Sequence, residues 1–297
     1  MPHLVAVMGE TASGKTHLAE SIADELGAQL VNADSFQIYR GLDIGTAKPT
    51  ATERYKLLDL KNADESFGTG EFVKLALEVV EACWGAKRSV VVVGGTGLNI
   101  RALFEEYSEM AAPPNPELRE ELNAQLEHKG LGSLVEELKL LDTAASERVD
   151  LANPVRVIRA IERAKGAKEA VTFRLPPFHR AKFAVENPSE VLNSRIETRV
   201  REMVQNGWAL EIERLREQGY RQSDPGFRAI GYRAMWEVVE DRKNLEQAIA
   251  DTVVETRQYA KRQRTWLRSE PNLIRLTADP GGEVLRQAMH YLANGMS

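Results

Sequence analysis

The chain carries the sequence Gly9-Glu10-Thr11-Ala12-Ser13-Gly14-Lys15-Thr16 directly after a short apolar run from Leu4 to Met8. These eight residues match the P-loop pattern, whose glycines allow successive backbone N–H groups to surround phosphate oxygens. Apolar residues follow at helical spacing as far as Gly27, which stands where a left-handed C-terminal cap belongs. The sequence therefore predicts a strand, a phosphate-binding turn and a helix, in the order that a P-loop requires.

Three further runs are strand candidates: Gln29 to Ala33, Ser89 to Val93 and Ala181 to Val185. The opening run, Leu4 to Met8, is apolar throughout, which is typical of a strand buried on both faces of a parallel sheet. Helical patterns lie between the strand candidates. This alternation predicts an α/β fold, a doubly wound parallel sheet of the P-loop NTPase type.

The pattern changes after residue 110. The proline-rich segment 112–116 breaks regular structure, and the residues up to about 168 have helical periodicity with almost no strand signal. We therefore predict two domains: a P-loop core domain formed by residues 1–110 and 181–297, and a helical insertion domain formed by residues 111–180.

The composition is that of an ordinary globular protein. With 297 residues, of which 43% are hydrophobic, the chain can bury a full core. A net charge of −5 argues against indiscriminate binding to polyanions. The single cysteine, Cys83, excludes an intramolecular disulfide and a cysteine-rich zinc finger. The chain starts as a strand rather than a leader and has no membrane-length apolar run, so we expect a cytoplasmic protein without a membrane partner.

The P-loop predicts a phosphate site. Lys15 supplies a positive charge and the Thr16 hydroxyl can ligate Mg²⁺, which we expect as the cofactor. The run from Ser89 to Val93 ends in Gly94-Gly95 and lacks the terminal Asp with which a standard NTPase holds its metal. Ordinary NTP hydrolysis is therefore disfavoured. The residues predicted to bind the phosphates are Gly9, Thr11, Ala12, Ser13, Gly14, Lys15 and Thr16.

Asp34 and Thr96 are the candidate catalytic residues. Each follows a strand candidate, and the carboxyl edge of a doubly wound sheet is where such folds hold ligands. Asp34 is the candidate base. An Asp at such a junction also commonly caps a helix or a turn, and Thr96 is equally compatible with an ordinary turn threonine.

Several segments together resemble the bacterial tRNA dimethylallyltransferases, the tRNA isopentenyltransferase family. Besides the P-loop, the resemblance rests on residues 32–41, 45–49 and 94–98, and it continues through 156–162, 229–233 and 256–263 in the expected order. It covers nearly the whole chain.

This resemblance implies transfer of the dimethylallyl group from dimethylallyl diphosphate to N6 of the adenosine 3′-adjacent to the anticodon in tRNA. Asp34 would accept the N6 proton or hydrogen bond, Thr96 would position the reacting groups, and the P-loop with Mg²⁺ would stabilise the leaving diphosphate. The target base would be extruded from its loop, and the enzyme is expected to be a monomer. The implied tRNA-binding residues are Asp34, Ser35, Phe36, Gln37, Arg119, Val155, Arg156, Val157, Ile158, Arg159, Arg233, Lys261 and Arg264.

Two basic helices are consistent with an RNA partner. Pro154 opens a predicted helix with arginines at 156, 159 and 163 on one side, and a second helix has basic residues at 257, 261, 264 and 268. A solvated basic face is the alternative for either helix. Tyr259 and Trp266 lie among the second set of charges and could stack on bases, but aromatic residues at this spacing are more often core residues, so we predict both as core and leave them out of the site.

The sequence departs from the family pattern at two positions near the site. Glu10 replaces the usual proline and adds a negative charge beside a diphosphate, and Asn99 stands where Tyr is common. Three alternatives remain: an adenylate-type (cytokinin) isopentenyltransferase, a P-loop small-molecule kinase that uses ATP, and an RNA-binding protein without catalysis. The helical insertion and the basic helices argue for a large RNA substrate.

Overall fold

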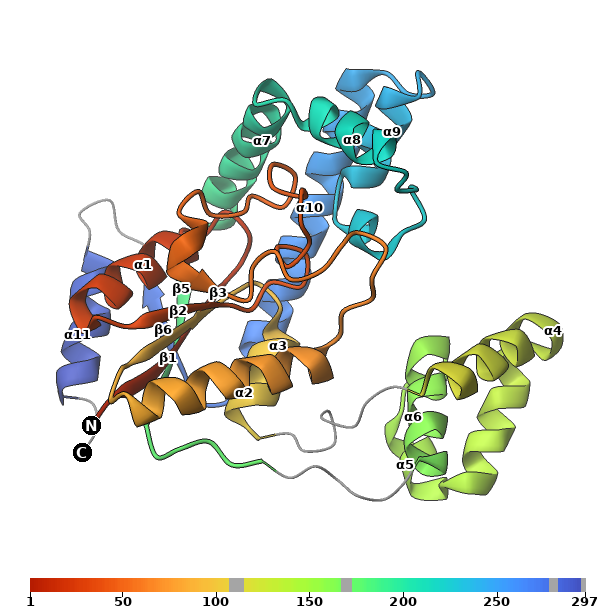
Figure 1. The fold of residues 1–297 in the computed structure, drawn as a ribbon, viewed down its shortest axis with the longest axis horizontal. Coiled ribbons are helices and arrows are strands. Elements are labelled where there is room, and N and C mark those ends of the chain that lie inside the picture. Colours follow the sequence, from red (N-terminus) through yellow and green to blue (C-terminus); the bar gives the residue numbers. More distant parts are fainter. Residues whose placement is uncertain (107–114, 167–172, 278–282, 295–297) are drawn as a thin grey trace. The chain divides into compact units, whose positions relative to one another are not determined.

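The computed structural model describes residues 1–106, 115–166, 173–277 and 283–294 (Figure 1). The chain divides into two compact units, a larger one made of Met1–Glu106 with Arg174–Ser297 and a smaller one made of Tyr107–Phe173. The end of the smaller unit differs from the expected boundary at residue 180. The reason is that His179 and Arg180 already pair with the central strand of the core sheet.

The larger unit is built on one sheet of six parallel strands in the order β3-β2-β4-β1-β5-β6, which confirms the doubly wound parallel fold. Four strands lie where the sequence predicts them, whereas β3 and β6 have no predicted counterpart. The strands are β1 (His3–Gly9), β2 (Gln29–Asn32), β3 (Tyr55–Lys56), β4 (Val90–Val93), β5 (His179–Glu186) and β6 (Leu273–Thr277).

Helices cover both faces of this sheet (Figure 1). On one face, α1 (Lys15–Leu26) and α11 (Glu283–Asn294) pack their apolar residues against the strands. On the other face lie α2 (Thr69–Gly85) and α3 (Gly97–Phe104), and α10 (Leu245–Arg268) contacts α3 and β1. The left-handed cap predicted at the end of α1 is present at Gly27, with a φ of 57°.

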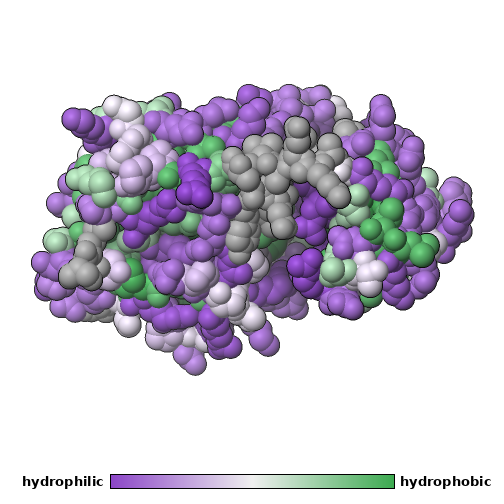
Figure 2. Space-filling model, turned by 90° about the horizontal axis from the view of Figure 1, so that it is seen from below, coloured by the Kyte–Doolittle hydropathy of each residue, from purple (hydrophilic) through white to green (hydrophobic). Residues whose placement is uncertain are grey.

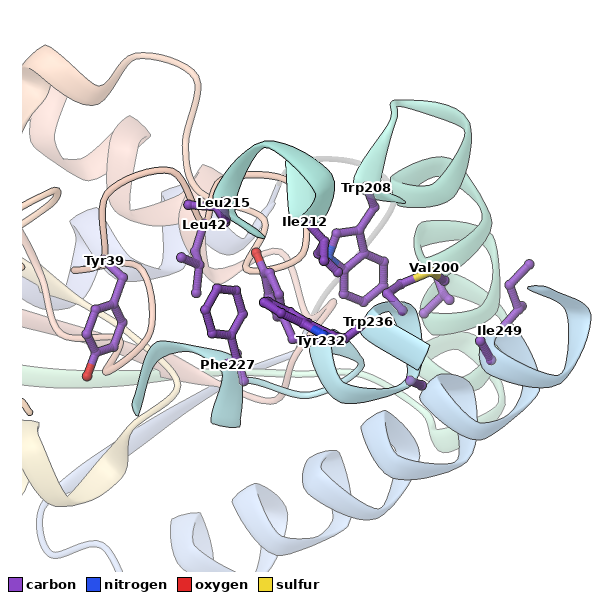
Figure 3. Packing of buried hydrophobic residues seen from close by; sticks show 14 of the residues in the cluster. Tyr39, Leu42, Val200, Trp208, Ile212, Leu215, Phe227, Tyr232, Trp236 and Ile249 are labelled. Atoms are coloured by element: carbon purple, nitrogen blue, oxygen red, sulfur yellow. The ribbon is translucent and has the colours of Figure 1, made fainter. Parts of the chain in front are cut away.

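A second hydrophobic cluster lies beyond the sheet and holds the loop that follows β2. It joins α7 (Ser189–Gln205), α8 (Trp208–Glu217) and α9 (Tyr232–Val239) to α10. Figure 3 shows the aromatic side chains at its centre, where the rings of Trp208 and Tyr232 meet edge to face at 5.4 Å. Ile38, Tyr39 and Leu42 of the loop are buried in the same cluster. The loop after Asp34 is thus fixed by packing.

The smaller unit is helical, as the sequence predicts. It contains α4 (Pro116–Leu141), which bends at Gly130, α5 (Thr143–Arg148) and α6 (Pro154–Lys165). Each helix begins with a side-chain cap, from Asn115, Asp142 and Asn153 respectively. The unit has a hydrophobic core of its own, formed by Leu122, Leu134, Leu138, Val157, Ile158, Ala160 and Ile161.

Both connections to the smaller unit start from one place on the core. The Glu106 carboxylate accepts a hydrogen bond from the backbone N–H of Leu175 at 3.2 Å and another from Arg180 at 2.8 Å. One residue earlier, Glu105 accepts a bond from Lys182 of β5 at 2.7 Å. The chain ends that lead into and out of the smaller unit are therefore held side by side.

The described surface is mainly hydrophilic. On the face that Figure 2 shows, hydrophobic residues form small groups among hydrophilic ones. The most exposed large hydrophobic residues are Leu140 and Val155, at 88% and 74% exposure, both in the smaller unit. Within the described ranges, every helix is too short or too polar to span a bilayer.

Candidate active site

The carboxyl ends of three neighbouring strands bring the predicted site segments together. Val7 of β1 and Asn32 of β2 both pair with Val93 of β4, so these strands end at the same level. The P-loop, Asp34 and Thr96 follow these positions within a few residues. All three therefore lie at the edge where doubly wound sheets hold ligands.

The P-loop borders a cavity of about 390 Å³. Gly14 precedes the first turn of α1, whose backbone N–H groups have no partner inside the helix and can bind an anion. Gly9, the last residue of β1, borders a separate cavity next to Thr96. The other predicted phosphate-binding residues line the 390 Å³ cavity itself: Thr11, Ala12, Ser13, Gly14, Lys15 and Thr16.

Two cations converge on this cavity. Burial lowers the pKa of Lys15 to about 8, with the positive charge of Arg199 adding to the effect and Asp34 opposing it. Arg199 reaches the cavity from α7, with its Nη1 atom 3.5 Å from Oγ1 of Thr11. Burial also lowers the pKa of Arg199, and Asp34 opposes that change. Two positive charges in one partly desolvated cavity are matched to a polyanion such as diphosphate.

Arg199 is absent from the residues that the sequence predicts for this site. The available signal was its position on α7, because Ile196, Val200 and Met203 form an apolar face of this helix and Arg199 lies within it. An arginine on the buried face of an amphipathic helix needs a charged partner or a ligand.

Asp34 and Thr96 are linked through Ser35. The backbone N–H and the hydroxyl of Ser35 donate to Oγ1 of Thr96 at 3.3 and 3.2 Å. Oδ1 of Asp34 accepts the backbone N–H of Phe36 at 2.9 Å, so Asp34 does stabilise its own turn. It also lines the phosphate cavity and the apolar cavity beside it. Asp34 therefore holds its own turn and also lines the candidate site.

The apolar cavity has a volume of about 350 Å³ and shares five lining residues with the phosphate cavity. An apolar part of its wall is formed by Ile196, Val200 and Met203 of α7 and by Trp208 of α8, and Arg228 and Arg262 also line it. The two cavities thus adjoin, and the second has a mainly apolar lining. The shared residues are Thr11, Asp34, Thr46, Arg199 and Tyr259.

The loop at 43–46 is held against this wall by a buried carboxylate. Glu211 accepts the backbone N–H groups of Asp43 and Ile44 at 2.8 and 2.6 Å, together with the hydroxyl of Tyr232 at 2.6 Å. Burial raises the pKa of Glu211, and these hydrogen bonds oppose the rise. A Cβ atom on Gly45 would lie 2.2 Å from Nε1 of Trp208, so only glycine allows the loop to approach the indole this closely.

Tyr259 belongs to the site, and the prediction that it is a core residue is wrong. Its ring lines both cavities, and its hydroxyl lies beside Thr96 and Gln263. Burial raises its pKa, and the charge of Asp34 raises it further. Trp266, predicted as core, packs against Gly97 and stacks under Arg101, whose guanidinium carbon lies 4.1 Å from the ring centre.

Comparison with known proteins agrees with this geometry. The model of the IPP transferase family matches residues 37–270. A tRNA dimethylallyltransferase of Anaeromyxobacter dehalogenans is 40% identical over 281 residues, which cover 91% of this chain and 93% of that protein. The chain belongs to the IPP transferase family.

Solved structures also resemble the chain. The full-length tRNA isopentenylpyrophosphate transferase of Bacillus halodurans is 32% identical with a TM-score of 0.70, and the match covers 99% of this chain and 96% of that one. A eukaryotic dimethylallyltransferase acting on tRNA, 20% identical, shares the fold with a TM-score of 0.79 over 99% of this chain and 79% of its own.

The two departures from the family pattern have structural explanations. Both carboxylate oxygens of Glu10 are bound by the guanidinium of Arg264, which also donates to Ser189 at 2.5 Å. The unusual charge beside the P-loop is therefore neutralised by α10. Asn99 is buried behind Asp34 and donates to the backbone oxygen of Ala33 at 3.1 Å, so it supports the loop after β2.

The residues of the larger unit that are implied to contact tRNA fall into two groups. Ser35, Phe36 and Gln37 lie on the loop after β2, where the amide nitrogen of Gln37 donates to the backbone oxygens of Thr46 and Ala47. The other three lie on α9 and α10. There the Arg233 side chain is 83% exposed, Lys261 is exposed, and Arg264 is engaged with Glu10.

The smaller unit corrects two of the implied tRNA contacts. Val157 and Ile158 are buried in its core, because the helical period turns them inward, so their side chains cannot meet RNA. Val155 and Arg156 are exposed. The remaining two residues, Arg119 and Arg159, share the buried carboxylate of Glu162, which Arg119 binds with two nitrogens at 2.8 and 2.7 Å.

Proposed function

We propose that this chain transfers the dimethylallyl group from dimethylallyl diphosphate to N6 of the adenosine 3′-adjacent to the anticodon in tRNA and releases diphosphate. The main support for this proposal is that Asp34 lines both the cationic phosphate cavity and the apolar cavity. A prenyl diphosphate has a charged end and an apolar end, and its reacting carbon lies between them. The site has the same polarity, with a proton acceptor at the junction.

The leaving group belongs at the P-loop. Lys15 and Arg199 place two positive charges there, and the first turn of α1 adds backbone N–H donors. These groups stabilise the negative charge that develops on the diphosphate as the bond between carbon and oxygen breaks.

The oxygen atoms available at the phosphate cavity also fit Mg²⁺. Among the described residues, no three His, Cys, Asp or Glu side chains gather in one place, so a metal here needs substrate oxygens. Mg²⁺ is usually held by one or two protein oxygens together with phosphate oxygens and water. Thr16 lines the phosphate cavity, as does Asp34, and would hold the ion. When bound, Mg²⁺ would neutralise charge on the diphosphate.

The acceptor amine belongs at Asp34. Attack of N6 on the first prenyl carbon forms the new C–N bond, while the electron pair of the breaking C–O bond leaves with the diphosphate. The proton lost from N6 passes to the Asp34 carboxylate, whose orientation is fixed by the backbone N–H of Phe36. Thr96 accepts the hydroxyl of Ser35 at 3.2 Å, and we assign it a positioning role through this contact with the residue next to Asp34.

The proposed donor is dimethylallyl diphosphate because the apolar wall of Ile196, Val200, Met203 and Trp208 suits a short branched hydrocarbon chain. The relatives are named for action on tRNA. We propose a monomer as the active species.

An assay with radiolabelled dimethylallyl diphosphate tests the proposal. The wild-type enzyme should label tRNA and leave AMP unlabelled. Asp34→Asn should lower turnover by roughly 10²- to 10⁴-fold with tRNA affinity retained, since a positioned general base contributes about that much. The matched control is Asp64→Asn, which changes an exposed aspartate on the same unit.

Three results would contradict the proposal. Labelling of AMP as fast as tRNA would favour an adenylate-type isopentenyltransferase. Phosphoryl transfer from ATP to a small molecule would favour a kinase. Full activity of Asp34→Asn would remove the assigned mechanism.

A further inference from the structure

Gln263 of α10 joins the two loops on which the reaction depends. Its Oε1 atom accepts the backbone N–H of Thr11 in the P-loop at 2.8 Å. Its Nε2 atom donates to the backbone oxygen of Gly95, directly before Thr96, at 3.0 Å. The residue is only 6% exposed, so both bonds form away from bulk water.

The surroundings leave little freedom for this side chain. A Cβ atom on Gly95 would lie 2.3 Å from Nε2 of Gln263 and 3.5 Å from the hydroxyl of Tyr259. A side chain at position 95 would therefore displace the Gln263 amide from this place. The amide also interacts with the hydroxyl of Tyr259, which contacts Thr96. The P-loop, α10 and the loop after β4 are thus connected through one amide group.

We propose that Gln263 is a positioning residue for the transfer reaction, an inference that rests on the proposed function. It acts by fixing the distance between the P-loop, which holds the diphosphate, and Thr96, which lies at the acceptor. Both polar atoms of the amide are used to hold backbone groups. Its contribution is therefore made through the P-loop and Thr96.

The consequence of losing this amide follows from what it holds. Without it, the N–H of Thr11 and the oxygen of Gly95 lose their partner, and the two loops can move apart. A displacement of about 1 Å between reacting groups can cost on the order of 10²-fold in rate. Groups that bind tRNA on the outer face of α10 are not touched by this change.

Gln263→Met tests the proposal, because methionine has a similar length, favours helix and offers no hydrogen bond of comparable strength. We expect kcat to fall by roughly 10- to 100-fold and the affinity for tRNA to stay within about twofold. Gln263→Glu keeps the acceptor for Thr11 and should lose less activity. Gln258→Met, at an exposed position on the same helix, is the matched control.

A double-mutant cycle separates positioning from general support of the fold. If Gln263 acts through Thr96, then Gln263→Met should cost much less in a Thr96→Ala background than in the wild type. Additive losses, or an unchanged kcat in a Gln263→Met protein that melts like the Gln258→Met control, would overturn the proposal. If Gln263→Met does not fold, the same cycle with Gln263→Glu decides between these outcomes.

Failure of the proposed function itself would look different. A wild-type enzyme that does not label tRNA would remove the reaction. The connection to the P-loop would then be measured by titrating wild type and Gln263→Met with inorganic diphosphate, where about a tenfold loss of affinity is expected and equal affinities would contradict the proposal.

Discussion

Raising the pH from about 8 to about 10 is expected to weaken the binding of diphosphate to the enzyme by roughly 50-fold. The reason is that burial beside Arg199 lowers the pKa of Lys15 to about 8, so the free enzyme loses this charge across that interval. Bound diphosphate keeps Lys15 charged, so above pH 8 the binding of diphosphate must be accompanied by the return of a proton to Lys15. The charged fraction of free Lys15 falls from about one half to about 1%, which corresponds to about 2.3 kcal/mol.

Isothermal titration with inorganic diphosphate over this pH interval measures the effect. Lys15→Arg is the matched control, because an arginine at this position stays charged throughout, so its profile reports the titration of diphosphate itself. The loss due to Lys15 is the difference between the two profiles. Equal profiles for the two proteins would refute the assignment, because the titrating group would then lie elsewhere.

The same shift affects folding stability. The folded pKa of Lys15 lies below the value of 10.5 for an exposed lysine, so between about pH 8 and 10.5 the unfolded chain binds more protons. The contribution of Lys15 to the free energy of unfolding therefore rises with pH through this window and is least favourable below about pH 8. Lys15→Met should be more stable than the wild type at pH 7, by about 1–3 kcal/mol in urea unfolding, whereas a less stable variant would contradict the assignment.

Three further outcomes are expected. Arg264→Met should weaken diphosphate binding about tenfold and lower the free energy of unfolding by about 1–3 kcal/mol, because Glu10 loses its partner. Adding Glu10→Pro should restore both quantities. If it restores neither, the effects of Arg264→Met do not come from Glu10. Glu162→Leu should lower the free energy of unfolding of the smaller unit by about 2 kcal/mol, since two arginines lose a shared carboxylate. A lower urea midpoint would show this, and an unchanged midpoint would mean that Glu162 does not stabilise the unit. The logarithm of tRNA affinity should fall linearly with that of salt concentration, and Lys261→Gln should reduce the slope by about 1; an equal slope would remove Lys261 from the interface.

The fold could be predicted from the sequence where periodicity and chain order determine it. The run from Leu4 to Gly27 contains a buried strand, a glycine turn and a capped helix, and the structure has all three there. By contrast, β3 has only two residues and β6 lies at the edge of the sheet with two of its five residues exposed, so neither produces a clear apolar run. Short and edge strands depend on their neighbours more than on their own sequence.

The site was predictable only where a motif marks it. Parallel strands that end at one edge predict that the segments after β2 and β4 meet there, and in the structure Ser35, next to Asp34, donates to Thr96. Arg199 was missed, although its place among the apolar positions of its helix was a signal in the sequence. The partner of Glu10 lies 254 positions away in sequence, and only the fold reveals the pair. The burial of Val157 and Ile158, in contrast, could have been predicted from the helical period.

The shared anchor at Glu106 and Leu175 has an implication for how such a chain can vary. The core itself holds the two ends of the insertion, at Glu106 and Leu175, next to each other. The entropic cost of bringing them together therefore depends only weakly on the length of the segment between them. The helical unit can therefore be lengthened, exchanged or replaced by a short turn without altering the order of the strands. In this architecture the inserted unit and the sheet can change independently, because all the strands of the described sheet belong to the larger unit.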